Sequence, residues 1–528
     1  MNGHDTLHRR QFLRASGATI AGMAASAALA ACGSGSSSTV AGNPLASQPA
    51  QPPSAQSQAT PVQSAASQPA AAALGKVVIR WWDHFQPLTP LHKKIWDTYT
   101  AGHANVQVDY TQYNPNEMAQ ALQLAFKSQQ MPDVHSLGGI SVPVPSLVKD
   151  NWFAPLNLSD DARKRLPEGS LLEGFSVFGG KVYSFPLFSF RQYTSLNWYN
   201  KDLFAKASID PTTNLRTWDQ FRQAAGAITK KGGGTAFGWI QGIGFVDRLG
   251  VHVNELAQTA GASTVGGPGP TGSDPKTGQY VYASDPYVQT LDFLASVQRD
   301  GSLFPASSTL DARTGRARWA TGTAGMFLDG PWNIGVVQGS FKDFTDKVGV
   351  APVPVPDTSK PAYIHVLPSG GQFFISSQSK HPDIAADILQ QLTTPDYYIG
   401  LAQQMDQPPL DLTAVDKANV QPTYKQAIKL FQDGVRLGPS PVVKNAAVSD
   451  VFAEMKDIHP NLGEIAQGVF SGDVKDTRAA LKEYNDKLTA ERDRALKVVT
   501  GKGAKVSLAD WVFANWQPDQ DYTAASYK

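Results

Sequence analysis

The sequence predicts an α/β fold with parallel strands, because strand-like and helical patterns alternate after residue 75. Residues 77–79 form an apolar run, and residues 106–110 alternate apolar and polar side chains as a half-buried strand does. Helical spacing appears over 91–99 and again in a segment that Asn116 caps. In a sheet built this way, helices cover the faces and ligands lie beyond the carboxyl ends of the strands.

Length, charge and cysteine content exclude several classes of protein. The chain has 528 residues, which allows two or three domains. Its 46 Lys and Arg nearly balance its 45 Asp and Glu, so no basic surface points to a nucleic-acid partner. The single cysteine, Cys32, excludes an internal disulfide and a cysteine metal site, and we expect no metal and no other cofactor.

The first 31 residues have the pattern of an export signal. A basic region over 8–14 precedes a run of small apolar residues that is too short and too rich in Ala and Gly to be a good membrane span. Arg9-Arg10 with Phe12-Leu13 resembles a twin-arginine signal, and residues 29–32 resemble a bacterial lipobox. That resemblance implies that Cys32 becomes a lipidated N-terminus, which anchors a protein by about 0.8 kcal/mol per buried methylene. The alternative is an incidental cysteine after an ordinary signal.

Residues 32–75 are predicted to be the lipidated cysteine followed by a disordered tether. From Gly33 to Gly75 there is no charged residue, and Ser, Gln, Ala and Pro dominate. Such a segment cannot bury enough apolar area to offset the entropy of ordering it. Its length corresponds to an end-to-end span of roughly 35–40 Å.

The middle of the chain continues with strands and capped helices. Two strand-like runs, 180–186 and 195–200, flank a segment over 189–193. Helices are expected to begin near Asp202 and after Thr217, which has the side chain of an N-cap. Glycine-rich loops are expected at 232–234 and 266–278, and a further helix at 286–299.

Residues 316–332, RARWATGTAGMFLDGPW, form the most informative stretch. A helix is expected to end before Gly322, and residues 324–328 suit a buried strand. Residues 329–331 are turn formers that precede Trp332. Locally, Trp332 fits either a core residue or a stacking platform for a ligand.

Beyond Trp332 the chain returns to strand-like runs and then becomes mainly helical. The runs cover 348–354 and 368–376, with paired glycines in the second. A helix is expected at 383–392, and helices dominate from there to about residue 497.

In their order, several of these segments resemble the bacterial extracellular solute-binding proteins of family 1, the maltodextrin and oligosaccharide type that feed ABC importers. The segments that carry the resemblance are 181–186, 199–204, 217–219, 325–332, 348–354 and 370–382.

The resemblance implies a two-lobe periplasmic-binding-protein fold of type II, with discontinuous lobes joined by hinge strands. The expected crossings lie near 188–193, 350–354 and 402–409. The first lobe would comprise 76–190 and 352–402, and the second 191–351 and 403–528.

The resemblance also implies a function. We expect reversible capture of a carbohydrate, an oligosaccharide, between the lobes, with hinge closure and no catalysis. The expected partners are the carbohydrate, ABC permease subunits and, through the lipid anchor, the membrane. The protein is expected to be a monomer at the extracytoplasmic face of a bacterial cell membrane.

The site residues are carried over position by position. Trp332 matches a sugar-stacking aromatic, and polar groups at the end of the first strand match groups that bond sugar hydroxyls. Tyr193 stands where maltodextrin binders carry an acid. The expected ligand-binding residues are Trp82, Asp83, His84, Tyr193, Trp239, Trp332, Gly370, Gly371 and Gln372.

Other roles stay open for several of these residues. Asp83 and His84 also fit a solvated loop or a helix cap. Gly370 and Gly371 also fit a simple turn, and Trp239 also fits a core.

An enzyme is the main rival class. A glycoside hydrolase needs two carboxylates about 5–10 Å apart, which a sequence cannot exclude. We find no phosphate loop, no His-Glu-x-x-His and no Gly-x-Ser-x-Gly motif. His252 and Glu255 could share a helix face, but one such pair is weak evidence for a metal. A third possibility is a binding protein that serves a membrane sensor.

Overall fold

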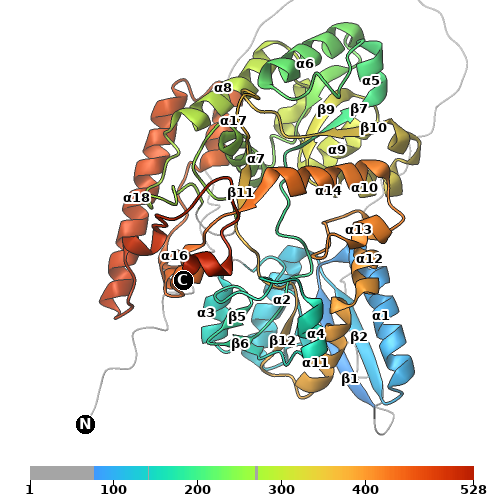
Figure 1. Cartoon of the computed structure of the whole chain (residues 1–528), viewed down its shortest axis with the longest axis vertical. Helices are drawn as coiled ribbons and strands as arrows, with labels where there is room; N and C mark the ends of the chain where they lie inside the picture. Colours follow the sequence, from blue (N-terminus) through green and yellow to red (C-terminus); the bar gives the residue numbers. More distant parts are fainter. Residues whose placement is uncertain (1–75, 141, 268–270) are drawn as a thin grey trace, which may run out of the picture. The chain divides into compact units, whose positions relative to one another are not determined.

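The structure is a computed structural model that describes residues 76–140, 142–267 and 271–528 (Figure 1). The predicted export signal, Cys32 and the tether lie outside the described residues. Among the described helices, none has the length and apolar character needed to cross a membrane.

The first sheet has the strand order β2-β1-β3-β12-β4. Its strands are β1 (Val77–Asp83), β2 (Val106–Gln112), β3 (Val134–His135), β4 (Phe153–Ala154) and β12 (Phe374–Ser376). β1 runs parallel to β2 and β3, whereas β12 is antiparallel to β3 and β4. Its helices are α1 (Thr89–Gly102), α2 (Pro115–Ser128), α3 (Val144–Lys149), α4 (Asp160–Arg165), α11 (Pro382–Gln390) and α12 (Pro395–Gln404). Because β12 comes from a distant part of the sequence, this lobe is discontinuous.

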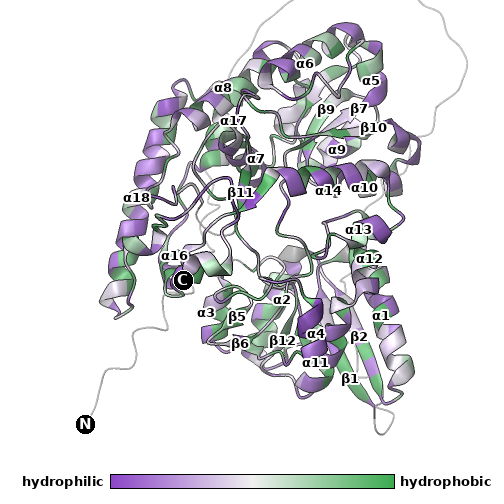
Figure 2. Ribbon diagram, viewed as in Figure 1, coloured by the Kyte–Doolittle hydropathy of each residue, from purple (hydrophilic) through white to green (hydrophobic). Residues whose placement is uncertain are grey.

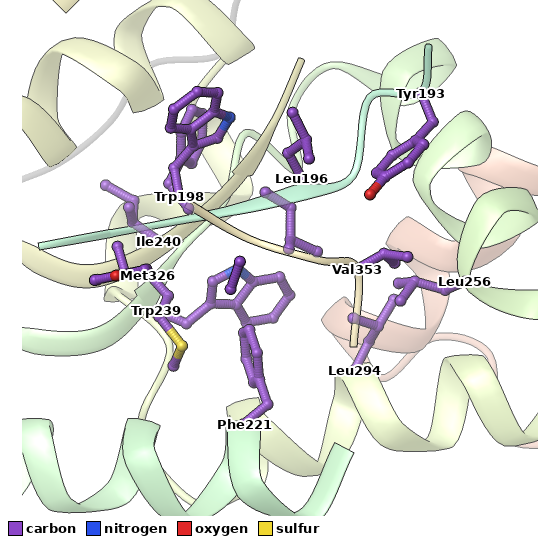
Figure 3. Packing of buried hydrophobic residues seen from close by; sticks show 14 of the residues in the cluster. Tyr193, Leu196, Trp198, Phe221, Trp239, Ile240, Leu256, Leu294, Met326 and Val353 are labelled. Carbon is purple, nitrogen blue, oxygen red and sulfur yellow. The ribbon is translucent and has the colours of Figure 1, made fainter. Parts of the chain in front are cut away.

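The second sheet has the order β10-β7-β9-β8. Its strands are β7 (Leu196–Asn200), β8 (Phe237–Ile240), β9 (Ala324–Asp329) and β10 (Val348–Ala351). β8 and β9 are parallel, and β7 is antiparallel to β9 and β10. Every residue of β7 and β9 is buried, so this sheet lies inside the second core. Figure 3 shows that core, with Trp198, Phe221 and Trp239 among its labelled side chains.

Helices surround the second sheet. They are α5 (Lys201–Lys206), α6 (Trp218–Gly232), α7 (Val246–Thr259), α8 (Asp285–Arg299), α9 (Ala312–Ala320), α10 (Asn333–Ser340) and α14 (Pro422–Gly434). Thr217 caps α6 as predicted, since its side chain accepts from the Gln220 backbone and Gln220 closes a capping box. A Cβ at Gly238 would lie 2.2 Å from the Ala225 backbone, so this glycine lets α6 approach β8 closely.

The remaining elements are short, apart from the last helix. The helices are α13 (Ala414–Lys417), α15 (Pro441–Lys444), α16 (Val448–Glu454), α17 (Leu462–Ser471) and α18 (Thr477–Gly501). Two strand pairs are β5 (Val177–Phe178) with β6 (Lys181–Val182) and β11 (Ile364–Val366) with β13 (Val435–Leu437). The 3-10 turns are η1 (Gln86–Leu88), η2 (Pro305–Thr309), η3 (Lys342–Lys347), η4 (Gln391–Thr393), η5 (Leu508–Trp511) and η6 (Ala524–Tyr527). α18 packs on α8, α16 and α17 and buries few of its residues. Figure 2 accordingly shows hydrophilic residues along much of α18.

One buried cluster accompanies the second sheet, and two others accompany the first. Together with the strand order, they confirm the predicted α/β fold with two lobes that are discontinuous in sequence.

The segments that connect the lobes differ from the expectation at one point. Ser189 N donates to Pro408 O at 2.9 Å and Leu410 N donates to Leu187 O at 2.8 Å, so the first and last connections run antiparallel to each other. In contrast, Val353 packs in the second core, and β11 pairs with β13. The predicted start of the returning segment at residue 352 is therefore too early, because the chain stays with the second lobe through Val366.

Candidate functional site

A cavity of about 530 Å³ opens beside Trp332 in the second lobe. Its wall includes the first connection, one face of α7 and the segment around β11, and it contains hydroxyl, amide and carboxylate groups. Polar side chains that line it include those of Ser189, Gln192, Asn254, Glu255, Gln258 and Gln407. A second hollow of about 590 Å³ lies at α5 and η3. We favour the first because it combines buried polar side chains with an indole.

Trp332 is half-buried and is held at the end of β9. Its Nε1 donates to Asp329 Oδ1 at 3.0 Å. The other carboxylate oxygen of Asp329 accepts from Arg316 Nε at 2.6 Å and from Asn333 Nδ2 at 3.1 Å. Since Arg316 and Asp329 are both buried, this ion pair forms a fixed anchor for the indole. Asp329, expected only as a turn former, thus has a further role.

Arg248 covers the ring of Trp332. Its guanidinium carbon lies 4.8 Å from the ring centroid, a cation–π contact. Nη1 of Arg248 is buried without a hydrogen-bond partner among the described residues. Burial lowers the pKa of Arg248, and the carboxylates of Asp329 and Glu255 oppose that shift.

Glu255 ties α7 to the first connection. Its carboxylate accepts from the Thr194 backbone at 2.9 Å and from Ser195 Oγ at 2.6 Å. Burial raises the pKa of Glu255, and these hydrogen bonds oppose the rise. His252, one turn earlier, accepts from Gln241 Nε2 at 3.0 Å through Nδ1, and burial lowers its pKa to about 3. The two side chains therefore bond to other protein groups, and the described residues contain no cluster of three His, Cys, Asp or Glu that could hold a metal ion.

The residues predicted at the end of β1 lie in the first lobe and do not line this cavity. Trp82 is half-buried and packs on Tyr113 at 5.1 Å between centroids. His84 Nδ1 is hydrogen-bonded to Ser136 Oγ at 2.7 Å, and burial lowers its pKa.

Asp83 is fully buried, which corrects its expected role as a ligand contact. Its Oδ1 accepts from Phe85 N at 2.9 Å and from Tyr110 OH at 3.0 Å, and its Oδ2 accepts from Trp81 Nε1 at 3.1 Å. Because both oxygens lie inside the core and bond to protein groups there, Asp83 is not accessible to a ligand.

Two aromatic residues predicted for the site have different positions. Tyr193 contributes to the cavity wall, although its ring is buried against Phe431 at 4.8 Å. Trp239 is 1% exposed and packs between Phe221 and Phe470. The expectation that Trp239 contacts a ligand is therefore corrected, because strand β8 points its ring into the core.

Gly370, Gly371 and Gln372 fasten the returning segment to the first lobe. Gln372 Oε1 accepts from Leu187 N at 2.5 Å, and its Nε2 donates to Gly370 O at 3.2 Å. A Cβ at Gly371 would lie 2.4 Å from that of Ser184, so the two segments touch there. The cavity wall ends at Ser369, which leaves these three residues outside it.

Residues 83–399 match the family described as bacterial extracellular solute-binding protein. The match covers more than half of the chain. This protein belongs to that family. A comparison with curated proteins finds no match.

Solved structures of other solute-binding proteins share the fold. The cyclic alpha-maltosyl-1,6-maltose binding protein from Arthrobacter globiformis is 18% identical, with a TM-score of 0.56 over 81% of this chain and 100% of that one. The GacH receptor of Streptomyces glaucescens, solved without ligand and with acarbose, is 17% identical, with a TM-score of 0.59 over 79% and 99%. The maltotriose binding protein of Thermus thermophilus, with maltotriose bound, is 19% identical, with a TM-score of 0.56 over 79% and 100%.

In this solute-binding protein, α7 carries cavity-lining residues that the sequence did not indicate as ligand contacts. Asn254, Glu255 and Gln258 line the cavity, and all three are buried. The signal was available in part, because polar side chains recur at helical spacing within an otherwise apolar segment. That pattern is usually a solvated face. Here it is covered by contacts from other parts of the chain, since Thr194 bonds to Glu255, His365 to Gln258 and Tyr287 to Asn254.

Proposed function

We propose that this protein is the solute-binding component of an ABC importer and that it captures an oligosaccharide in the cavity beside Trp332. The observation that carries the proposal is a half-buried indole, anchored through Asp329, beside a cavity with polar side chains. Membership of the family supports it, as do the sugars that the similar proteins bind.

The chemistry of the wall suits a sugar. The part of the indole that lines the cavity offers apolar contact to the C–H groups of a pyranose. Ser189, Gln192, Asn254 and Gln407 supply donors and acceptors that match sugar hydroxyls. A volume of about 530 Å³ is within the range of small-molecule sites.

Capture would be completed by hinge closure. We place the hinge at three connections, near 188–193, 367–371 and 405–410, and the lobes at 76–187 with 372–404 and 194–366 with 411–528. Trp82 and His84 are proposed to meet the ligand from the first lobe when the lobes close. Closure must be driven by contacts that form only in the closed state. We propose reversible binding without a catalytic step, in keeping with a family of solute-binding proteins.

We further propose that the protein is exported, lipidated at Cys32 and held as a monomer at the outer face of the cell membrane, where it meets the permease subunits. The pattern of residues 8–32 supports the export and the anchor.

Calorimetry of the full chain against a glycan panel that includes maltotriose tests the proposed ligand class. We expect micromolar or tighter binding of at least one oligosaccharide, and we expect Trp332→Ala to weaken it about tenfold or more because the stacking surface is lost. Trp218→Ala is the matched control, since Trp218 is also half-buried but does not line the cavity.

Binding of a peptide, a polyamine or a metal ion, with none of any glycan, would show that the ligand class is wrong. A Trp332→Ala protein that no longer folds would show instead that Trp332 is a core residue.

A further inference from the structure

We propose that Gly330 is a positioning residue for ligand binding: only a residue without a side chain at this position lets the indole of Trp332 keep its orientation beside the cavity. The inference rests on the proposed function, because it takes Trp332 as the surface on which the ligand stacks.

The ring of Trp332 lies against the bare Cα of Gly330. A Cβ at position 330 would lie 2.3 Å from Cζ2, 2.4 Å from Cη2 and 2.6 Å from Cε2 of that ring. Contacts below 3.0 Å essentially never occur for a real Cβ. The indole therefore occupies the space that any side chain at position 330 would need.

A positive φ does not explain this glycine. Gly330 is not among the glycines with positive φ, so its φ lies in the range that residues with a side chain also adopt. What excludes a side chain at this position is the neighbouring ring.

The backbone of Gly330 cannot easily move away from the ring. The buried Trp198 donates through Nε1 to Gly330 O and to Asp329 O, at 3.1 Å in each case. Asn333 N also donates to Gly330 O, at 3.2 Å. Because these hydrogen bonds hold the backbone in place, an added Cβ at position 330 would force the indole of Trp332 to turn away.

A turned indole would lose the contacts that define its present orientation. Nε1 would leave Asp329 Oδ1, now at 3.0 Å, and the ring would leave the Arg248 guanidinium. Asp329 would not follow the ring, because Arg316 and Asn333 hold it. Gly330→Ala should therefore change the orientation of the Trp332 indole, whereas the ion pair between Arg316 and Asp329 stays intact.

The test uses the full chain with its tryptophans labelled with ¹⁵N, so that each indole N–H gives an NMR signal. The signal of Trp332 is identified by its disappearance in Trp332→Phe. We expect Gly330→Ala to shift this signal and to speed the exchange of its proton with solvent. The matched control is Gly339→Ala on α10, where an added Cβ meets no atom within 4 Å.

Affinity for maltotriose is measured on the same proteins. Gly330→Ala should weaken binding tenfold or more, and Gly339→Ala less than twofold. In a Trp332→Ala background, Gly330→Ala should change affinity less than twofold, because the ring that it displaces is already gone.

An unchanged Trp332 signal in Gly330→Ala would overturn the proposal. So would an equal loss of affinity in both backgrounds. If Gly330→Ala alone does not fold, the double variant with Trp332→Ala should fold, and failure of the double variant would also overturn it. Wild-type protein that binds no glycan would count against the proposed function, whereas the indole signal would still report whether Gly330 sets the ring.

Discussion

Acid should destabilise this protein in part through His252, a buried imidazole on the helix that lines the candidate cavity. His252 is 2% exposed, and burial lowers its pKa in the folded protein to about 3. An unfolded chain has no such burial, so its imidazole takes up a proton near pH 6.5. Between these two pKa values the unfolded state binds more protons than the folded state, and stability therefore falls as the pH falls.

The magnitude follows from the proton balance. From pH 6.5 to pH 5 the unfolded imidazole becomes almost fully charged while the folded one stays neutral. The cost approaches about 1.4 kcal/mol per pH unit below pH 6, so relative to pH 7.5 His252 alone should lower the free energy of unfolding by about 2 kcal/mol at pH 5. His135, whose pKa burial lowers to about 4, acts in the same direction from the first lobe.

Urea unfolding at several pH values between 7.5 and 5, followed by circular dichroism, measures this effect. His252→Gln removes the titrating group, so its stability should fall less steeply below pH 6.5 than that of the wild type. The substitution also changes packing, and for that reason the comparison is between pH slopes rather than between stabilities at one pH.

His459→Gln is the control. His459 is exposed, and its hydrogen bond to Glu464 raises its pKa, so the stability that it contributes is present below pH 6.5 and is lost as the pH rises. His459→Gln should therefore make the loss of stability below pH 6.5 slightly steeper. Parallel pH curves for wild type and His252→Gln would refute the reasoning about His252.

Two further predictions concern Trp239 and Cys32. Trp239→Ala should lower the free energy of unfolding by about 3–5 kcal/mol because it empties a core position, while the folded fraction binds maltotriose within twofold of the wild type; a large loss of affinity without loss of stability would contradict the core assignment. Cys32→Ser should move the protein from the membrane fraction to the soluble extracytoplasmic fraction, as judged by fractionation of expressing bacteria, and a protein that stays in the membrane fraction would argue against a lipid anchor at this residue.

Local chemistry accounts for the parts of the fold that the sequence predicted. Thr217 was expected to cap a helix, and its hydroxyl does so because the cap depends only on the next three residues. The alternation of strands and helices from 77 to 135 could also be predicted, because each of these patterns depends on residues that are close together in the sequence.

Long-range contacts account for what was missed. Val355 forms a bridge with Thr217, and β11 pairs with β13, so residues 353–366 stay with the second lobe. These partners are far away in sequence, and no pattern within 350–366 indicates them. The polar face of α7 was missed similarly, since its burial depends on partners from distant segments, such as Tyr287 for Asn254 and His365 for Gln258.

The tryptophans show why a site residue is harder to predict than a core residue. Trp81 and Trp82 are neighbours in β1, yet the first is fully buried and the second is half-buried, because successive strand residues point to opposite faces. Trp239 lies inside β8, whereas Trp332 follows β9 after a turn. Whether a tryptophan lies within a strand or follows the end of one thus distinguishes Trp239 from Trp332, which the residue type cannot do.

The glycines before these tryptophans extend that distinction. Gly238 precedes Trp239 and admits the backbone of α6 at Ala225, and the indole of Trp239 packs on Phe221 of the same helix. Gly330 stands two residues before Trp332 and admits the indole of that residue itself. The same absence of a side chain therefore closes one tryptophan into the core and sets the other at the edge of a cavity, and a sequence alone cannot tell which partner each glycine receives.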